Sequence, residues 1–458
     1  MNEIAARLPS FLGGLITIFL TFYFARTYFS TEIALMSSLI LASAGQFFLL
    51  WGTVHLDFTL TAAITGMLVS WVRYSFPIST DTNKSSWVFA STLFLSAAIG
   101  MLTKGPISIV LAALPIGVWS IFRGEVKKSL TLPWGFGLTL FLVCVSPWFY
   151  FAEIASPGFI KYFFINENFL RYVSKEYGDE YGAGHTAFRG ASIFMLLQGM
   201  LPWSLLLLFF IKKFRFSMET FLSWMRSFSG FALLWGIMPA LFFTLSKQLL
   251  PAYMLPGFGG CSIIIALSIL RIKDSSDLIS QIFKWSNIIL PILSIIIIPV
   301  GAIYFFSSNV QIIGGIVVSL SLLIFIYKNN TTHYAQSVSL SALSISLLLG
   351  SILIAGGSFI SMRRSTGAII EIIRESKPKH SFPLGLIIGR NFSAFFYDNA
   401  LIDQQIDIIR IPPDQIVESN IPDFIIESSQ LSQLHPDVLN RYTAKTKLVK
   451  WIWFSKNS

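Results

Sequence analysis

Long apolar stretches separated by polar connections fill the first 360 residues of the chain. A helix that crosses a bilayer needs roughly 20 consecutive apolar residues, and about twelve stretches approach that length. They are residues 8–28, 33–52, 55–74, 87–101, 104–122, 132–152, 191–211, 228–246, 250–270, 287–305, 309–327 and 337–359. The pattern predicts a polytopic α-helical membrane protein, with a longer polar loop at 153–190.

Beyond residue 360 the pattern becomes that of an ordinary globular domain. Short runs that alternate between apolar and polar residues predict strands, and two longer stretches predict helices. The predicted strands are 384–388, 392–397, 406–411, 423–426 and 448–454, and the predicted helices are 366–375 and 429–441. We therefore divide the chain into a transmembrane domain, 1–360, and a small α/β domain, 361–458.

Composition agrees with a membrane protein and charge gives its orientation. Only 12% of the residues are charged and the mean hydropathy is +0.68, whereas soluble domains contain about 25% charged residues. The net charge of +10 does not indicate nucleic-acid binding, because fourteen basic residues follow odd-numbered spans and six follow even-numbered ones. Basic connections stay in the cytoplasm, so the 153–190 loop and the C-terminal domain are expected outside.

The 153–190 loop holds several ionisable residues that could act on a ligand. If residues 163–173 are helical, Glu167 and Arg171 form an i,i+4 pair on one face. One interpretation is an interfacial amphipathic helix stabilised by this pair. The other makes Arg171 a phosphate ligand that Glu167 orients. His185, in the glycine-rich second half, is too little by itself to predict a metal site.

Three further charged residues stand at the predicted outer ends of spans. Asp57 either orients a hydroxyl or a partner side chain, or it interacts with the N-terminus of its helix. Lys104 precedes Gly105-Pro106, which break the helix and free N–H groups for an anion; alternatively the lysine extends to the membrane interface. The same two interpretations apply to Lys247.

These features occur in a recognisable order along the membrane domain. The segments that carry it are 5–10 (Ala-Ala-Arg-Leu-Pro-Ser), 102–106 (Leu-Thr-Lys-Gly-Pro), 146–148 (Ser-Pro-Trp), 167–171, 176–179, 201–204 (Leu-Pro-Trp-Ser) and 246–256. The chain resembles the bacterial GT-C glycosyltransferases of the protein-mannosyltransferase and aminoarabinose-transferase type. The resemblance implies transfer of a sugar from a polyprenyl-phosphate carrier to a lipid, glycan or protein acceptor at the periplasmic face of the inner membrane.

The resemblance also implies roles for individual residues. Arg171, Lys104 and Lys247 match positions expected to bind the donor phosphate, and Asp57 matches a catalytic carboxylate. Glu167, Asn168 and His185 would orient the loop. A divalent metal ion is expected from the family, but Asn168 stands where many relatives have a histidine ligand, so the metal site would be incomplete.

There are two alternatives to an active glycosyltransferase, and the first follows from departures from the family pattern. The family has a first span and a large outer loop before the segment that matches residues 5–10, and we expect this chain to lack both. The chain could therefore be an inactive relative that binds polyprenyl-phosphate lipid without transfer. A solute transporter would show buried charges or paired broken helices, and the sequence indicates neither.

Overall fold

The computed structural model describes most of the membrane part of the chain and the core of its C-terminal domain. The described residues are 3–78, 83–170, 187–211, 217–246, 249–272, 277–305, 313, 316, 319–320, 334–364, 372, 382–387, 406–411, 415–419, 421–447 and 451–457. Their contacts form two compact units. The first comprises Arg7–Leu290 and Leu323–Leu349, and the second Met1–Ala6, Pro291–Leu322 and Gly350–Ser458.

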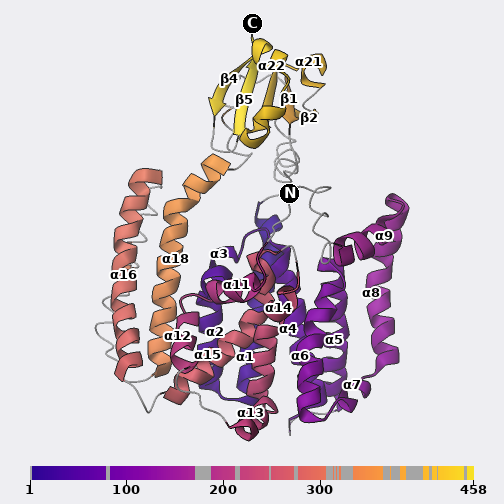
Figure 1. Ribbon diagram of the computed structural model, residues 1–458, viewed down its shortest axis with the longest axis vertical. Helices are drawn as coiled ribbons and strands as arrows, with labels where there is room; N and C mark the ends of the chain where they lie inside the picture. Colours follow the sequence, from indigo (N-terminus) through magenta and orange to yellow (C-terminus); the bar gives the residue numbers. More distant parts are fainter. Residues whose placement is uncertain are drawn as a thin grey trace. The chain divides into compact units, whose positions relative to one another are not determined.

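Helices account for nearly all of the described membrane part (Figure 1). They are α1 (Glu3–Tyr28), α2 (Thr31–Ser43), α3 (Gly45–Leu50), α4 (Leu56–Ser75), α5 (Asn83–Lys104), α6 (Ile107–Arg123), α7 (Lys127–Leu130), α8 (Trp134–Ala155), α9 (Phe159–Lys161), η1 (Tyr162–Leu170), α11 (Ala191–Gly199), α12 (Ser204–Ile211), α13 (Met218–Met225), α14 (Phe228–Phe243), η3 (Pro251–Gly257), α15 (Phe258–Ile272), α16 (Asp277–Phe305) and α18 (Tyr334–Arg364).

Several of these helices can cross a membrane. Within the described residues, five are long and apolar enough: Ile4–Tyr28, Asn83–Lys104, Trp134–Ala155, Pro251–Arg271 and Gln336–Leu353. The pair α13 and α14, bent by 82°, would make a sixth. The polytopic α-helical class is confirmed, and the count of twelve spans stays a prediction.

Two predicted spans are each broken, and their breaks meet. The stretch 33–52 divides at Ala44 into α2 and α3, and 191–211 divides around Pro202 into α11 and α12. Across the breaks the N–H of Gly45 donates to the Leu201 carbonyl at 2.8 Å, and Trp203 Nε1 donates to Ser43 Oγ at 3.0 Å. Backbone groups freed at membrane depth need such partners. The expectation of no paired broken helices was therefore wrong.

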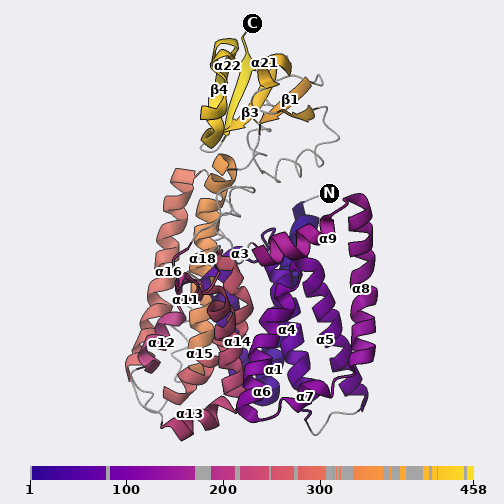
Figure 2. The same cartoon turned by 45° about the vertical axis from the view of Figure 1, so that its right-hand side comes forward.

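Helices α4, α5, α6 and α8 lie side by side in the first unit (Figures 1 and 2). Helix α4 has Asp57 in its first turn and Arg73 in its last turn, while α5 runs back and ends at Lys104. Arg26, Arg123 and Arg271 also lie in the last turns of α1, α6 and α15. The acidic beginning of α4 and the basic end of α5 therefore meet, 47 residues apart in the sequence.

The second unit contains a five-stranded mixed sheet in the order β2-β1-β3-β5-β4. Strands β2, β1 and β3 are parallel, whereas β5 pairs antiparallel with both β3 and β4. Their bounds are β1 Phe382–Ile387, β2 Ile406–Arg410, β3 Asp423–Glu427, β4 Tyr442–Lys447 and β5 Trp451–Lys456. The α/β class is confirmed.

Two details of this domain differ from the sequence prediction. The predicted helix 429–441 is two pieces, η6 (Ser428–Gln433) and α22 (Pro436–Arg441), because Pro436 fits only the first turn of a helix. Strand β4 was missed. Its residues after Tyr442 are mostly exposed and polar, so an edge strand here lacks the apolar alternation that identifies strands. The predicted strand 392–397 and helix 366–375 lie outside the described residues, apart from Ile372.

Candidate functional site

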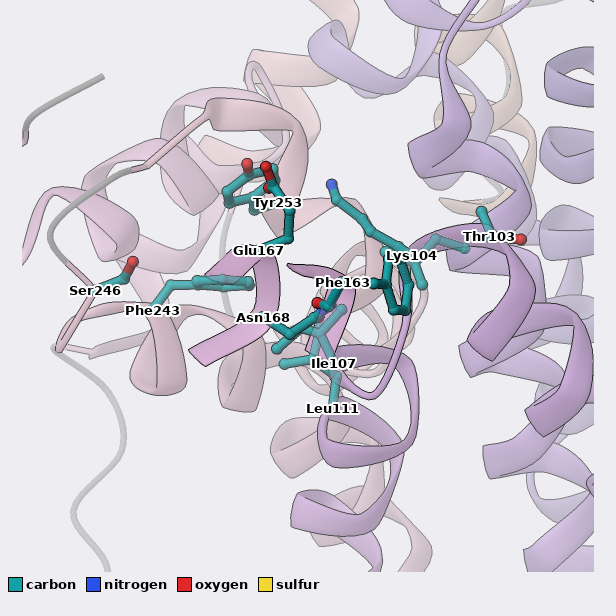
Figure 3. A pocket seen from close by; sticks show the side chains of 11 residues that line it. Thr103, Lys104, Ile107, Leu111, Phe163, Glu167, Asn168, Phe243, Ser246 and Tyr253 are labelled. Atoms are coloured by element: carbon teal, nitrogen blue, oxygen red, sulfur yellow. The ribbon is translucent and has the colours of Figure 1, made fainter. Parts of the chain in front are cut away.

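A cavity of about 220 Å³ opens where the ends of several helices of the first unit converge (Figure 3). Its polar lining comes from the end of α5, from η1, from the segment between α14 and η3 and from η3 itself, and its apolar lining comes from α4, α6, η1 and α14. The lining residues are Leu60, Thr103, Lys104, Ile107, Leu111, Phe163, Glu167, Asn168, Phe243, Ser246 and Tyr253. A mostly apolar cavity with a few convergent polar groups is typical of a ligand site.

The centre of the site is the ion pair between Asp57 and Lys104. Lys104 Nζ lies 2.5 Å from Asp57 Oδ1, and His55 Nδ1 lies 3.4 Å from Asp57 Oδ2. The Asp57 side chain is 9% exposed, compared with 31% for Lys104 and 37% for His55. Both carboxylate oxygens therefore contact neighbouring side chains, one the ammonium of Lys104 and the other the imidazole of His55. The N-cap residue of α4 is His55, whose side chain makes no capping hydrogen bond.

Lys104 is further positioned by an aromatic ring. Its ammonium lies 4.1 Å from the ring centroid of Tyr253, and Tyr253 in turn packs against Phe243 at 5.1 Å between centroids. A cation held over an aromatic face keeps its charge while the contact fixes its direction. Figure 3 shows the amine directed towards Tyr253 and Glu167. Lys104 is therefore held at the cavity wall and does not simply extend to the membrane interface.

The turn after Lys104 is built for close contact with η1. Gly105 has φ +82°, in the left-handed region that glycine adopts without cost. A Cβ placed on Gly105 would lie 2.8 Å from Asn168 Nδ2 and 2.9 Å from Phe163 Cζ. Asn168 itself donates from Nδ2 to the Phe163 carbonyl at 2.9 Å. The glycine thus brings the cavity lining of η1 directly against the end of α5.

Segment η1 is a π-helix that ends at Leu170, so the predicted pair of Glu167 with Arg171 lies partly outside the described residues. Glu167 accepts a 2.6 Å hydrogen bond from the hydroxyl of Tyr162. Phe163 and Phe164 pack on Phe149 of α8, with centroids 5.3 and 5.4 Å apart. Phe164 is still 37% exposed and Phe169 is 62% exposed.

The entry into this segment is fixed by Glu153 near the end of α8. Its two carboxylate oxygens accept the backbone N–H groups of Gly158, at 2.8 Å, and Ile160, at 2.7 Å. With these two hydrogen bonds the carboxylate closes the turn at the start of α9. The turn sets the direction in which η1 reaches the cavity.

A second, larger cavity of about 780 Å³ lies beside the broken helices of the same unit. Its walls are mostly apolar and include the break residues Gly45, Leu201 and Pro202. The polar side chains among its lining residues are Gln46, His55 and Gln198. His55 lines this cavity while Lys104 lines the first, so Asp57 joins the two through its two oxygens.

Three of the predicted site residues, Arg171, His185 and Lys247, lie outside the described residues. The others, Asp57, Lys104, Glu167 and Asn168, are either lining residues of the first cavity or bound to one. Their roles in catalysis and phosphate binding stay predictions.

A divalent metal ion does not fit the donor atoms found here. Within the described ranges, no group of three or more His, Cys, Asp or Glu side chains could hold a metal ion. Asp57 is already paired with Lys104, and the Asn168 amide is directed to a backbone carbonyl. We therefore derive no step through a metal.

Sequence reasoning missed three residues that the structure places in or beside the site. Tyr253 lies in the segment that also holds Lys247, His55 lies two residues before Asp57, and Glu153 lies at the end of an apolar stretch. The local signal of a capped turn was the carboxylate of Glu153 followed by Pro157 and Gly158.

Comparisons with known proteins agree with the resemblance. Residues 1–151 match the family described as dolichyl-phosphate-mannose-protein mannosyltransferase. An undecaprenyl phosphate-alpha-4-amino-4-deoxy-L-arabinose arabinosyl transferase from Proteus mirabilis is 29% identical over 54% of this chain and 41% of its own length. One from Pseudomonas fluorescens is 28% identical over 56% of this chain and 44% of its own. The chain thus spans less than half the length of these relatives.

The fold is also similar to that of a solved structure. The crystal structure of ArnT from Cupriavidus metallidurans bound to undecaprenyl phosphate has a TM-score of 0.73 and 17% identity, and the match covers 99% of this chain and 84% of that one. The apo structure of the same protein has a TM-score of 0.69. The GT-C-type fold and the resemblance stated from the sequence are confirmed.

Proposed function

We propose that this protein is a membrane glycosyltransferase that transfers a sugar from a polyprenyl-phosphate carrier to a lipid, glycan or protein acceptor. The observation that carries the proposal is the position of Lys104, whose ammonium is held by Asp57 and Tyr253 at the wall of an otherwise apolar cavity. A polyprenyl phosphate has the matching chemistry, an anionic head on an apolar chain.

The chemical role of Lys104 follows from the charge that develops during transfer. An acceptor oxygen attacks the anomeric carbon while the phosphate leaves with the electron pair of the broken bond. A cation already fixed near the leaving phosphate stabilises that charge without reorganisation. Asp57 and Tyr253 hold the amine so that it is in place before the reaction, and Arg171 and Lys247 are proposed as further phosphate ligands.

The wall formed by η1 would hold the sugar. Glu167 and Asn168 offer a carboxylate and an amide carbonyl to hydroxyl or amino groups, and both line the cavity. Apolar side chains such as Leu60, Leu111 and Phe243 complete the lining for the carrier. The relatives named as arabinosyl transferases support transfer in preference to the inactive alternative.

The proposed orientation follows from the distribution of charges. The cavity lies at the ends of α5 and α14 and the beginning of α4, whereas arginines occupy the opposite ends of α1, α4 and α6. Because basic helix ends stay in the cytoplasm, the site would face the periplasm of the bacterial inner membrane. A divalent metal ion stays a separate proposal from the family pattern, without support from the described donor atoms.

The test is transfer of radiolabelled sugar from undecaprenyl phosphate-linked donors by the purified protein in proteoliposomes. Lys104→Ala should reduce transfer at least about 100-fold, since removing one fixed stabilising group costs that much in other enzymes. Lys84→Ala is the matched control, because Lys84 is exposed at the other end of the same helix. Arg171→Ala should also abolish transfer without affecting membrane insertion. Equal transfer by Lys104→Ala and Lys84→Ala would contradict the proposal.

A further inference from the structure

We propose that His55 accepts the proton of an acceptor hydroxyl during transfer, an inference that rests on the proposed function. His55 is one of the lining residues of the 780 Å³ cavity, and Asp57 connects it to the lysine of the first cavity. The site would therefore have its phosphate-binding cation on one side of the Asp57 carboxylate and its proton acceptor on the other.

The geometry of the pair favours this role for the histidine over the aspartate. Asp57 is 9% exposed with both oxygens engaged, whereas His55 is 37% exposed at the cavity. A carboxylate at Nδ1 favours the tautomer in which Nδ1 carries the hydrogen and Nε2 carries the lone pair. The carboxylate also stabilises the imidazolium that forms when Nε2 takes up a proton, as in other His–Asp pairs.

The side chains that line the second cavity favour an acceptor with a neutral hydroxyl group. Its polar side chains, Gln46, His55 and Gln198, are neutral amides and an imidazole, which hydrogen-bond hydroxyls. A Cβ on Gly199 would lie 2.3 Å from Gln46 Oε1, so the amide packs directly on that backbone. An anionic acceptor would instead call for cations, and this cavity has none among its described lining residues.

The step conserves atoms and electrons without any further reactant. The acceptor oxygen forms a bond to the anomeric carbon, and the bond between that carbon and the phosphate oxygen breaks. Its electron pair goes to the phosphate, which Lys104 stabilises. The hydroxyl proton moves to His55 Nε2 and is later released to water.

Few charged groups face His55, so few groups besides His55 contribute to the pH dependence of transfer. Asp57 lies on its own turn, and Lys104 approaches the same carboxylate from α5. Among the described residues that line the second cavity, no other side chain is ionisable. A feature of the pH profile of transfer that is present in the wild type and absent in the His55 variants therefore reports on this residue.

The chain offers a matched control in its C-terminal domain. His435 is also the N-cap residue of a helix, α22, and its Nδ1 lies 3.3 Å from Asp437, two residues on. That pair is 64% and 61% exposed and, in the described part of the chain, belongs to neither cavity. A local His-x-Asp pair by itself therefore does not make the site.

The experiment measures transfer against pH for the wild type, His55→Ala, His55→Gln and His435→Ala in proteoliposomes, with and without added imidazole. We expect kcat to fall at least about 100-fold in both His55 variants, as for loss of a proton acceptor, with the KM for the donor unchanged. Added imidazole should restore transfer by His55→Ala, where the missing ring leaves a void, but not transfer by His55→Gln. The control His435→Ala should transfer sugar as the wild type does.

Other results would overturn the proposal. A kcat for His55→Ala within about threefold of the wild type, or no rescue by imidazole in variants that melt at the wild-type temperature, excludes His55 as proton acceptor. Retention of undecaprenyl phosphate by each variant is measured by native mass spectrometry. If the wild type neither retains that lipid nor transfers sugar, the proposed glycosyltransferase function is wrong. That result differs from one in which the wild type transfers sugar and the His55 variants do so equally well, which overturns only the role of His55.

Discussion

Lys104 at the end of α5 and Asp57 at the beginning of α4 form an ion pair with 2.5 Å between Nζ and Oδ1, although 47 residues separate them in the sequence. The pair brings a cation to the cavity and fixes the ends of two packed helices against each other. Because the carboxylate is buried, either residue without the other would leave a charge in an apolar environment.

A double-mutant cycle should therefore show strong coupling between these residues. Asp57→Asn and Lys104→Met should each lower the melting temperature in detergent, and the double variant should lose less than the sum of the two. We expect a coupling energy of about 1–3 kcal/mol. The pair Glu125 and Lys128, 3.5 Å apart with side chains 32% and 39% exposed, is the control, with a coupling energy below about 0.5 kcal/mol. Additive effects at Asp57 and Lys104 would contradict the structural role.

Gly105→Ala should damage the site more than the same change at another left-handed glycine. Gly105 at φ +82° and Gly124 at φ +69° share the backbone cost of a Cβ, roughly 1–2 kcal/mol. At Gly105 the Cβ also meets Asn168 and Phe163 within 3 Å, whereas at Gly124 nothing lies within 4 Å.

The difference between these two alanine variants isolates the contact with η1. Melting temperatures and transfer rates measure it, and Gly105→Ala should lower both beyond the effect of Gly124→Ala. Equal effects would mean that η1 does not need its close approach to the end of α5.

Glu153→Ala should loosen the entry to η1. The variant loses the hydrogen bonds to the N–H groups of Gly158 and Ile160, so the turn should open and expose residues near 156–161. Limited proteolysis followed by mass spectrometry measures the rate of cleavage there, which should rise severalfold. Glu219→Ala, at an exposed position in the first turn of α13, is the control; no change in cleavage for Glu153→Ala would refute the capping role.

In the C-terminal domain, Trp453→Phe should destabilise the sheet. Trp453 Nε1 donates to Asp423 Oδ1 at 3.0 Å, and Asp423 is fully buried. Removing one donor from a buried carboxylate costs about 1–3 kcal/mol. Hydrogen exchange of β3 and β5 in the full chain measures the loss. Unchanged hydrogen exchange of both strands in Trp453→Phe would contradict this account.

Local patterns in the sequence were sufficient for the class of the fold. The lengths of apolar stretches predicted the helices α5, α6 and α8 closely, and the alternation of apolar and polar residues predicted β1, β2, β3 and β5. Both succeed because positions that are buried in the folded protein are occupied by apolar residues in the sequence. The break at Ala44 left no such record, and Pro202 marks only a place where a helix can end. Each break is stabilised by hydrogen bonds to the other, between segments more than 150 residues apart, which no local window contains.

The sequence by itself determined that this is a polytopic membrane protein with an α/β domain, and it placed Asp57, Lys104 and Glu167 as residues of interest. Only the tertiary structure decided what those residues touch. Helix packing puts Asp57 between Lys104 and His55, and the π-helical η1 turns Glu167 to Tyr162. The physical reason is that helix formation depends on neighbours in the chain, whereas ion pairs and cavities depend on which helix ends meet.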